Sequence, residues 1–394
     1  MSASNARRAS HNVRTHVLNG TAPHAASIDG LILSSSVNGR DVLNGEDVIE
    51  LRPQVAAAFA KMAEVLAEAG ATPDDVGLMT VNMANYGEVR QAVLDEWDRM
   101  FPNGQGPVMH MLVPQGGFPK PNTFLGIQFV ARKGAKRQSL VIDGQAREGN
   151  LPHVVTLGDF VVVGKIVPAE GLTDDAQAKS IFEQLDARLA AANVKKSEVG
   201  YLRTYCQTRE GRGLVQRAFS DYFGSARDAA LPALLPLVLP EMPRSGAMEM
   251  SHAFAVRNGT AEGFLFDQSL IDTDCRVGSD IAVRGPFFFS AGISGLRMAG
   301  GKRETEPNAQ AENMYQAARQ ALEGISCTFD NLCKVNMWLS GKSSKDLALI
   351  GWKKIFGTSD QGARDKTPAR TFLIHAQPAL DPDVFVEFEL IGVR

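Results

Sequence analysis

The chain has 394 residues, of which 44% are hydrophobic and 22% are charged, and its formal net charge is −3. This composition is typical of a soluble globular protein with two or three domains and substantial cores. Because there is no basic excess and no long apolar run, we expect neither nucleic acid nor a membrane as a partner. The four cysteines, Cys206, Cys275, Cys327 and Cys333, lack metal or redox spacing, which favours free thiols in a reducing cytoplasm.

Residues 1–20 include a Ser-, Asn- and Arg-rich stretch with no hydrophobic core, so we expect a disordered N-terminal tail rather than a secretory signal. Strand-like and helical patterns then alternate up to Ala131. The expected elements are a strand at Gly30–Ser35, a helix through Val55, Phe59, Met62 and Leu66, a strand at Val76–Met83, a helix through Val89, Val93 and Trp97, and strands at Val108–Val113 and Phe124–Ala131.

The same order of elements recurs twice, which indicates an internal triplication. Val76, Val199 and Leu332 open the equivalent strand of each copy, at offsets of 123 and 133 residues. A glutamine stands at one equivalent position upstream, and an aromatic residue stands near the end of each second helix. These residues are Gln54, Gln177 and Gln310, and Trp97, Phe219 and Trp352. A period this long predicts repeated domains rather than a solenoid.

Linkers rich in charge and glycine separate the copies, so we expect domains at 21–138, 139–262 and 263–394 after the tail. Each domain is predicted to be α+β, with one mixed sheet and two helices on one face. Three such units in one chain suggest a pseudo-threefold assembly, the covalent counterpart of a homotrimer. The other sheet faces would then meet at the centre, and clefts would form between neighbouring domains. The protein would be a monomeric pseudo-trimer or a higher homo-oligomer.

The third copy, about residues 275–394, resembles the Rid (YjgF) family. The motifs that carry the resemblance are Phe289-Ser290-Ala291-Gly292, the helix with Gln310, the helix end Trp352…Phe356, Pro368-Ala369-Arg370 and Val386-Glu387-Phe388-Glu389. The family's enamine/imine deaminases are homotrimers of a chorismate-mutase-like α+β unit, with a site at each subunit interface. The resemblance therefore implies a metal-free hydrolase or deaminase whose sites lie between domains.

The resemblance also implies site residues. Arg370 matches the family arginine that grips a substrate carboxylate, and Glu387 matches the glutamate that positions or activates water. The backbone of Ser290, Ala291 and Gly292 matches the strand end that lines the pocket, and the amide of Phe372 matches a donor to the substrate oxygen. From the residues alone, Arg370 and Glu387 are equally well interpreted as a buried ion pair that holds the sheet.

The first two copies depart from this pattern. The first has Met109 and Gly126 at the positions of Arg370 and Glu387, and the second has Leu234 and Glu249. Only the third cleft would keep the full pair. Glu249 is a possible member of a second site, with an interface hydrogen bond as the alternative.

Two histidines, His24 and His153, share one position in the first two copies, where the third has Asp280. The family's N-terminal strand leans over the neighbouring pocket, so either histidine could lie near Arg370, although a structural hairpin histidine is the simpler interpretation. No spacing of histidines and cysteines predicts zinc, and no phosphate- or dinucleotide-binding motif occurs. We therefore expect neither a metal nor another cofactor.

Together these observations predict a cytoplasmic hydrolase that acts on a C–N bond of a small enamine, imine or related metabolite bearing a carboxylate. The main alternative is a non-catalytic metabolite binder or scaffold, since a fold does not fix a function. A lesser alternative is a pathway-specific amidase or a ring-opening amidohydrolase of the cyanuric acid type. The ring-opening enzymes need a Ser–Lys pair in every repeat, and we do not find that set around Ser34, Ser35 and Lys165.

Overall fold

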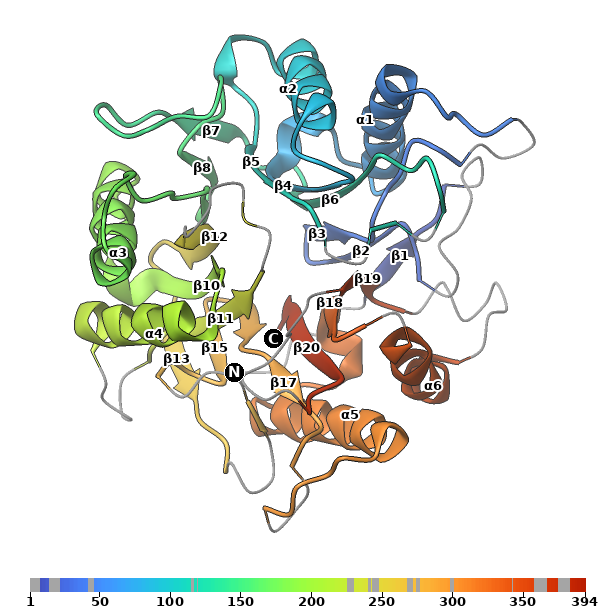
Figure 1. Cartoon of the computed structure of the whole chain (residues 1–394), viewed down its shortest axis with the longest axis vertical. Helices are drawn as coiled ribbons and strands as arrows, with labels where there is room; N and C mark the ends of the chain where they lie inside the picture. The colour runs from blue at the N-terminus through green and yellow to red at the C-terminus, as the bar shows by residue number, and fades with distance from the viewer. Residues whose placement is uncertain are drawn as a thin grey trace.

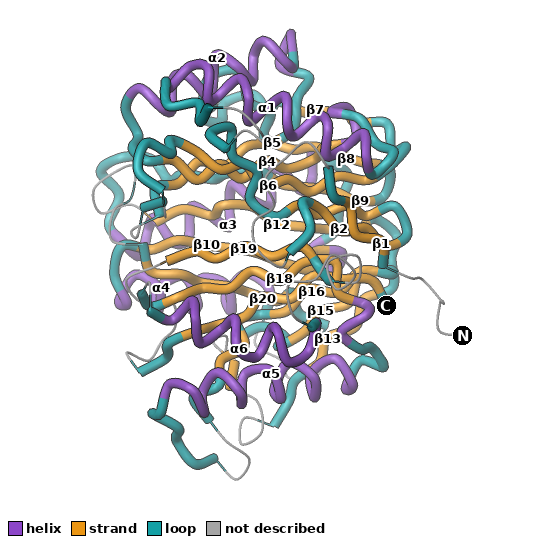
Figure 2. Tube along the Cα trace, turned by 90° about the vertical axis from the view of Figure 1, so that its right-hand side faces the viewer, coloured by secondary structure: helices purple, strands orange, loops and turns teal. Residues whose placement is uncertain are grey.

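In the computed structural model, the chain forms three α+β domains around a common centre, with helices outside and sheets inside (Figures 1 and 2). The structure describes residues 8–13, 22–41, 46–114, 117–118, 120–224, 230–239, 242, 248–267, 272–273, 277–297, 301–341, 343–357, 367–374 and 383–394. Each domain has one mixed sheet and two helices, so the fold class predicted from the repeat is confirmed.

The first two domains each have a six-stranded sheet, in the orders β1-β2-β3-β6-β4-β5 and β11-β10-β12-β9-β8-β7. The first contains β1 (Ala9–His11), β2 (Ala25–Ile28), β3 (Leu31–Ser34), α1 (Leu51–Glu68), β4 (Val76–Met83), α2 (Glu88–Met100), β5 (Val108–Leu112) and β6 (Leu125–Arg132). The second contains β7 (Arg137–Leu140), β8 (Val154–Leu157), β9 (Phe160–Val163), α3 (Asp174–Ala191), β10 (Val199–Cys206), α4 (Arg209–Phe223), β11 (Ala233–Val238) and β12 (Met248–Val256).

The third domain repeats this plan with an eight-stranded sheet. It contains β13 (Ala261–Phe264), β14 (Asp272–Thr273), β15 (Ile281–Arg284), β16 (Phe287–Ser290), β17 (Ile293–Ser294), α5 (Pro307–Gly324), β18 (Leu332–Leu339), α6 (Ser344–Phe356), β19 (Ala369–Ile374) and β20 (Val386–Val393). A short 3₁₀ helix precedes the central strand of every domain, at Pro73–Asp75, Lys196–Glu198 and Phe329–Asn331.

The central strands β4, β10 and β18 open at Val76, Val199 and Leu332, as the repeat predicted. Each pairs in parallel with the strand that follows the second helix and antiparallel with the last strand of its domain. Every residue of these central strands is buried, because helices cover one sheet face and the other domains cover the second.

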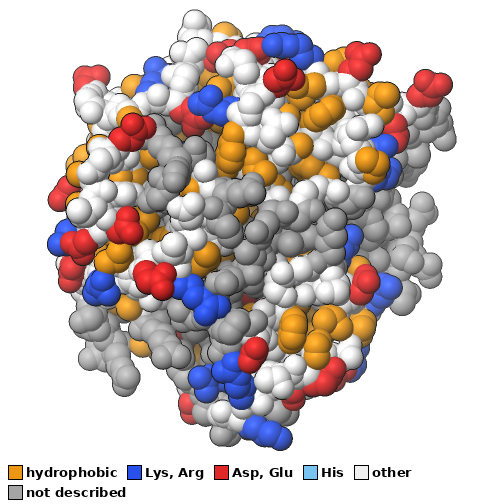
Figure 3. All heavy atoms as spheres, in the orientation of Figure 1, with side chains coloured by type: hydrophobic (Ala, Val, Ile, Leu, Met, Phe, Trp, Pro, Cys, Tyr) orange, Lys and Arg blue, Asp and Glu red, His pale blue; other side chains and the backbone are white. Residues whose placement is uncertain are grey.

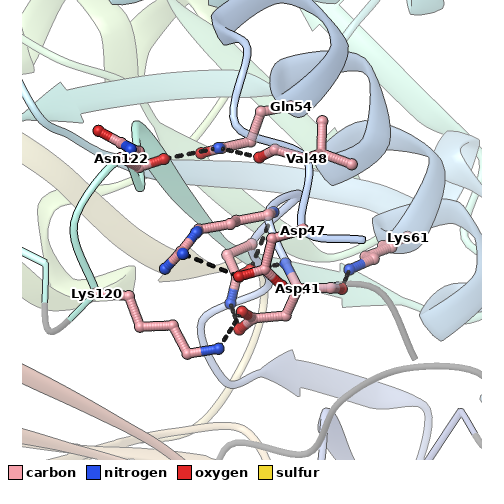
Figure 4. A network of polar contacts seen from close by, with 9 residues as sticks. Asp41, Asp47, Val48, Gln54, Lys61, Lys120 and Asn122 are labelled. Carbon is pink, nitrogen blue, oxygen red and sulfur yellow. Dashed lines mark hydrogen bonds and ion pairs between the residues drawn. The ribbon is translucent and has the colours of Figure 1, made fainter. Parts of the chain in front are cut away.

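The repeated glutamine secures the start of the last strand. The side-chain oxygen of Gln54 accepts from the Phe124 amide, and its nitrogen donates to the carbonyls of Val48 and Asn122 (Figure 4). Gln310 makes the matching bond with the Phe385 amide, and Gln177 makes it with the Met248 amide. A glutamine suits this position because its one side chain can both accept and donate hydrogen bonds.

An arginine clasp joins each domain to another in cyclic order. Arg8 of the first domain donates to the carbonyl of Leu332, and Arg137 of the second donates to that of Val76. Arg284 of the third domain donates to the carbonyl of Val199. The three accepting residues are the first residues of β18, β4 and β10, the equivalent strands of the third, first and second domains. The three contacts therefore close a ring of domains. A single hydrophobic cluster with members from all three sheets, including Leu33, Tyr201 and Ile391, fills the centre.

The structure moves the expected boundaries at the domain starts. β1, at Ala9–His11, lies inside the expected disordered tail but pairs with β2, as β7 pairs with β8 and β13 with β15. β1 is therefore the edge strand of the first sheet. Arg8 beside it is tied to the third domain. β7 begins at Arg137 and β13 at Ala261, slightly before the expected starts at 139 and 263.

The surface carries no obvious block of one charge on the face shown in Figure 3, where acidic and basic side chains are intermingled. Among the described residues, no helix combines the length and the apolar character needed to cross a membrane.

Candidate functional site

The side chains of Arg370 and Glu387 lie on opposite faces of the third sheet. The Arg370 guanidinium lies 4.5 Å from the ring centre of Trp352 in α6 and 4.6 Å from that of Phe372, on the helix side. On β20, Phe388 packs against Tyr315 of α5, so the alternation of a strand turns Glu387 toward the centre of the molecule. The expected pair in one cleft is therefore not formed by these two side chains.

The other residues expected beside this pair have identifiable places. The Ser290 hydroxyl accepts from the Leu390 amide and ties β16 to β20, and Ala291 joins the hydrophobic cluster of the second domain. Phe372 contributes its ring to the contact with Arg370. Gly292 lies against Glu387, since a Cβ atom there would come within 1.2 Å of the Glu387 Oε1 atom.

His24 and His153 are hairpin residues. Nδ1 of His24 accepts from the Val13 amide at 3.2 Å, and Nδ1 of His153 accepts from the Ile142 amide at 2.8 Å. Asp280, at the same position of the third domain, accepts from the Phe266 amide at 2.7 Å. Because one backbone contact recurs in all three domains, these side chains serve the strand arrangement.

A buried polar cluster joins the first two domains instead. Glu249 on β12 occupies the position of Glu387, since Tyr205 and Trp338 are their respective partners on the central strands. Its Oε1 atom lies 2.8 Å from Nε2 of His110, which comes from β5 of the first domain. Its Oε2 atom lies 3.3 Å from Nζ of Lys165, which follows β9. His110 is fully buried, and its ring stacks on Tyr205.

The charges of this cluster follow from its contacts. Burial favours the neutral form of Glu249, but Lys165 and His110 outweigh it and hold the pKa of the carboxyl at about 2. Burial likewise opposes the charge of Lys165, yet Glu249 and Glu148 raise the pKa of its amine. Burial lowers the pKa of His110 despite the neighbouring carboxylate. The cluster therefore holds a carboxylate, an ammonium group and a neutral imidazole.

These charge states fix the tautomer of His110. An ionised carboxylate can only accept, so the imidazole donates to Glu249 through Nε2–H. The Nδ1 atom then carries a lone pair, and it has no hydrogen-bond partner among the described residues. Such an orphaned buried acceptor calls for an explanation. A histidine oriented by a carboxylate, with its other nitrogen unprotonated, has the arrangement of a general base.

The polar chain continues from this cluster toward solvent. Lys165 lies 3.8 Å from a carboxylate oxygen of Glu148, which pairs with Arg90 of α2 at 2.8 Å. Tyr86, whose hydroxyl accepts from the Val113 amide, is close enough for Glu249 to contribute to its raised pKa, although burial is the larger cause. Arg90 is partly exposed, so positive charge is available near solvent at this interface.

The two positions that Lys165 and Glu249 occupy in the second domain carry different residues in the other domains. Ser36, Lys165 and Gly292 occupy one equivalent position, and Gly126, Glu249 and Glu387 occupy the facing one. A Cβ atom on Gly126 would meet Ser36 Oγ at 2.3 Å. Each domain therefore combines the two positions in a different way, and only the second builds an ion pair there.

The sequence indicated Glu249 as a possible site residue and did not single out His110. It did not bring the two together, because they are 139 residues apart and belong to different domains. One usable signal was present: Lys165 is charged at a strand end where the other domains have Ser36 and Gly292.

No protein-family model and no curated protein sequence matches the chain. Solved structures do match it. A Yersinia pestis protein of the conserved Rid family, titled as being of unknown function, is 15% identical over 34% of this chain and 100% of its own, with a TM-score of 0.29. Escherichia coli TdcF, solved with bound serine, is 16% identical over 34% of this chain and 99% of its own, also with a TM-score of 0.29.

A protein described as a probable translation initiation inhibitor, from Rhodopseudomonas palustris, is 18% identical over 32% of this chain and 95% of its own, with a TM-score of 0.29. In each case nearly all of the matched chain corresponds to about a third of this chain. Each matched structure is therefore about as long as one of the three domains described above.

Proposed function

We propose that this protein hydrolyses a C–N bond of a small enamine or imine that carries a carboxylate, at the interface of its first and second domains. The observation that carries the proposal is the contact between His110 of β5 and Glu249 of β12, with the Nδ1 atom of His110 left as a buried acceptor. The expected site residue Glu387 is replaced in this role by its equivalent in the second domain.

In this mechanism, Nδ1 of His110 takes a proton from water while the oxygen attacks the carbon of the C=N bond. The π electrons of that bond move to nitrogen, which is protonated to give a carbinolamine. Proton transfer from the oxygen and to the nitrogen then releases ammonia and leaves a carbonyl compound. An enamine enters the same sequence after tautomerising to the imine. Glu249 stabilises the imidazolium that forms, as the carboxylate of a catalytic triad does.

The substrate carboxylate is assigned to the positive groups of the same interface. Lys165 keeps its charge because two carboxylates surround it, and Arg90 holds a planar guanidinium beside Glu148. A guanidinium can pair with a carboxylate through two parallel hydrogen bonds. The substrate carboxylate would take the place of the Glu148 carboxylate beside Arg90 and Lys165, and since both groups carry one negative charge, the charge balance of the site would be kept.

The test is an assay of imine hydrolysis with 2-aminoacrylate generated in the cuvette. His110→Leu places at this position the residue that the second domain has at Leu235. We expect the rate above buffer to fall about 10²–10⁴-fold, the usual contribution of a general base. The matched control is Glu387→Gln, which changes the equivalent glutamate of the other interface and should keep the rate. An unchanged rate in folded His110→Leu would overturn the proposal.

One observation favours the alternative of a non-catalytic binder or scaffold. Both carboxylate oxygens of Glu249 are already satisfied, by His110 and Lys165, and the cluster is buried. Such a cluster can simply hold two domains together. Calorimetry with 2-keto acids separates the alternatives, because binding without turnover in the imine assay identifies a binder.

A further inference from the structure

A small cavity lies where the three sheets meet. Its volume is about 30 Å³. Its polar walls come from all three domains: Ser34, Thr80 and Gln128 from the first, Arg203 and His252 from the second, and Lys334 and Asn336 from the third. One water needs about 10–15 Å³ of such space, so the cavity admits only a molecule of a few atoms.

Lys334 is the nucleophilic group of this cavity. Its amine donates to the backbone carbonyl of Ser34 and, at 2.5 Å, to the hydroxyl of Thr371. Lys334 is 3% exposed, so its amine is largely removed from bulk water. A neutral amine has two N–H bonds, and both are used by these acceptors. Its lone pair then remains available on the third side of the nitrogen.

Among the described residues, no carboxylate lies within ion-pair distance of the Lys334 amine. Glu389, the carboxylate that attracts the Lys334 amine, receives Arg203 at 2.6 Å on both oxygens, as well as the Tyr201 hydroxyl and the Asn336 amide. Burial lowers the pKa of Lys334 to about 7, and Arg203 adds to this effect against the attraction of Glu389. A substantial share of Lys334 is therefore neutral at physiological pH.

Two further groups around the cavity have unused hydrogen-bonding capacity. Nε2 of Gln128 is a buried donor, and Oδ1 of Asn336 is a buried acceptor, and neither has a partner among the described residues. Both side chains are more than nine-tenths buried. Unsatisfied buried polar groups that line one cavity point to an occupant that accepts from the first and donates to the second.

We propose that Lys334 is a carbamylation site for carbon dioxide. The amine nitrogen forms a bond to the carbon, and one C=O π pair moves onto oxygen. The nitrogen then loses a proton to solvent, so that lysine and carbon dioxide give a carbamate and a proton. The product carries one negative charge and an N–H group. Its oxygens accept from Gln128 Nε2, and Arg203 beside the cavity supplies positive charge.

The proposal selects one buried lysine against another. Lys165 is also largely buried, but Glu249 and Glu148 keep it as an ammonium group without a lone pair. An ordinary exposed lysine is neutral in only about one molecule in a thousand at pH 7.4. Modification should therefore concentrate on Lys334 among the lysines of the chain.

The experiment uses the full-length protein with ¹³C-labelled bicarbonate in equilibrium with carbon dioxide at pH 7.4. The adduct is observed by ¹³C NMR, then fixed by alkylation of the carbamate and located by peptide mass mapping. We expect a carbamate signal and a label on Lys334 at least about tenfold above that on Lys165, in line with their neutral fractions. Equal labelling of the two, or an unlabelled Lys334, would overturn the proposal.

Two variants sharpen the result. Lys334→Leu introduces the residue that the first domain has at Leu78, and it should remove the part of the carbamate signal that the mapping assigns to position 334. Gln128→Met removes the unpaired donor but keeps the lysine, and it should weaken carbon dioxide binding severalfold. If Lys334→Leu does not fold, the mapping of the unaltered protein still decides the matter.

Discussion

Lys165 and Gly292 occupy equivalent positions in the second and third domains, and each decides how its facing glutamate is held. Lys165 pairs with Glu249 at 3.3 Å, whereas Gly292 leaves room for Glu387 to fold against its backbone. The first domain has Ser36 opposite Gly126, so neither of these two positions carries an acid. One pair of positions thus distinguishes the three domains chemically, which identical subunits of a homotrimer could not achieve.

Gly292→Ala tests the close approach of the Glu387 side chain to Gly292. The new Cβ atom would overlap Glu387 Oε1, so we expect a loss of about 1–3 kcal/mol in the free energy of unfolding, as in other overpacked sites. Denaturant unfolding provides the measurement. Adding Glu387→Ala removes the overlapping atoms, and the double variant should lose less stability than the sum of the single changes. Strict additivity would contradict the contact.

Arg370→Met separates the structural and catalytic interpretations of Arg370. Its guanidinium stacks on Trp352 and Phe372, so the loss of these cation–π contacts should lower the stability by about 1–3 kcal/mol. Imine hydrolysis should remain within about twofold of the original rate, since the proposed site lies at another interface. A loss of activity without a loss of stability would instead return Arg370 to the site.

The stability should depend on pH through His110. Burial places its folded pKa below the ordinary value of 6.5, so at pH values below 6.5 the unfolded chain binds a proton that the folded chain excludes. Stability therefore falls as pH drops from 6.5 toward the folded pKa. Comparison of unfolding free energies from pH 7.5 to 5 in the unaltered protein and His110→Leu isolates this contribution. Parallel curves for the two proteins would contradict it.

Glu249 should give a second loss of stability at lower pH. Its folded pKa of about 2 lies below the ordinary 4.5, so the stability that it contributes is present above 4.5 and lost as pH falls toward 2. Glu249→Gln should therefore flatten the acid limb of the stability curve, while Glu183→Gln on the exposed face of α3 should not. Unfolding followed by circular dichroism between pH 5 and 3 measures the difference.

The arginine that clasps the neighbouring domain stands on different strands in the second and third domains, so the arrangement of one can be built into the other. Arg284 pairs in register with Ala261, whereas the second domain has Arg137 in the place of Ala261 and Leu157 in the place of Arg284. Arg284→Leu should cost about 2–3 kcal/mol, because the Val199 and Ala230 carbonyls lose their donor. Adding Ala261→Arg recreates the arrangement of the second domain and should restore much of the loss. Failure of any restoration would show that the two positions are not interchangeable.

Most of the fold was predictable because its signals are local. The helices that bury Phe59 and Trp97 and the apolar central strands follow from residue spacing within short windows, and the triplication repeats each signal three times. The structure adds a reason for the repeated glutamine, which holds the start of the last strand. The N-terminal strand β1 was missed because β2 and the third domain hold it in place, whereas its own residue pattern gives no strand signal.

The site was less predictable because it depends on sheet face and on domain contact. To place Arg370 and Glu387 relative to each other, one must know which face of the sheet each side chain points to. Successive side chains of a strand point to opposite faces, so the choice of face changes with each residue along the strand.

The sequence by itself determined three α+β units, their equivalent positions and the singular residues Lys165 and Glu249. Only the tertiary structure decided that His110 meets Glu249, that Arg370 turns away from Glu387 and that Lys334 lies in a shared central cavity. The physical reason is that spacing along the chain specifies a face within one element. The partner across a domain interface depends instead on how three separately formed sheets pack together.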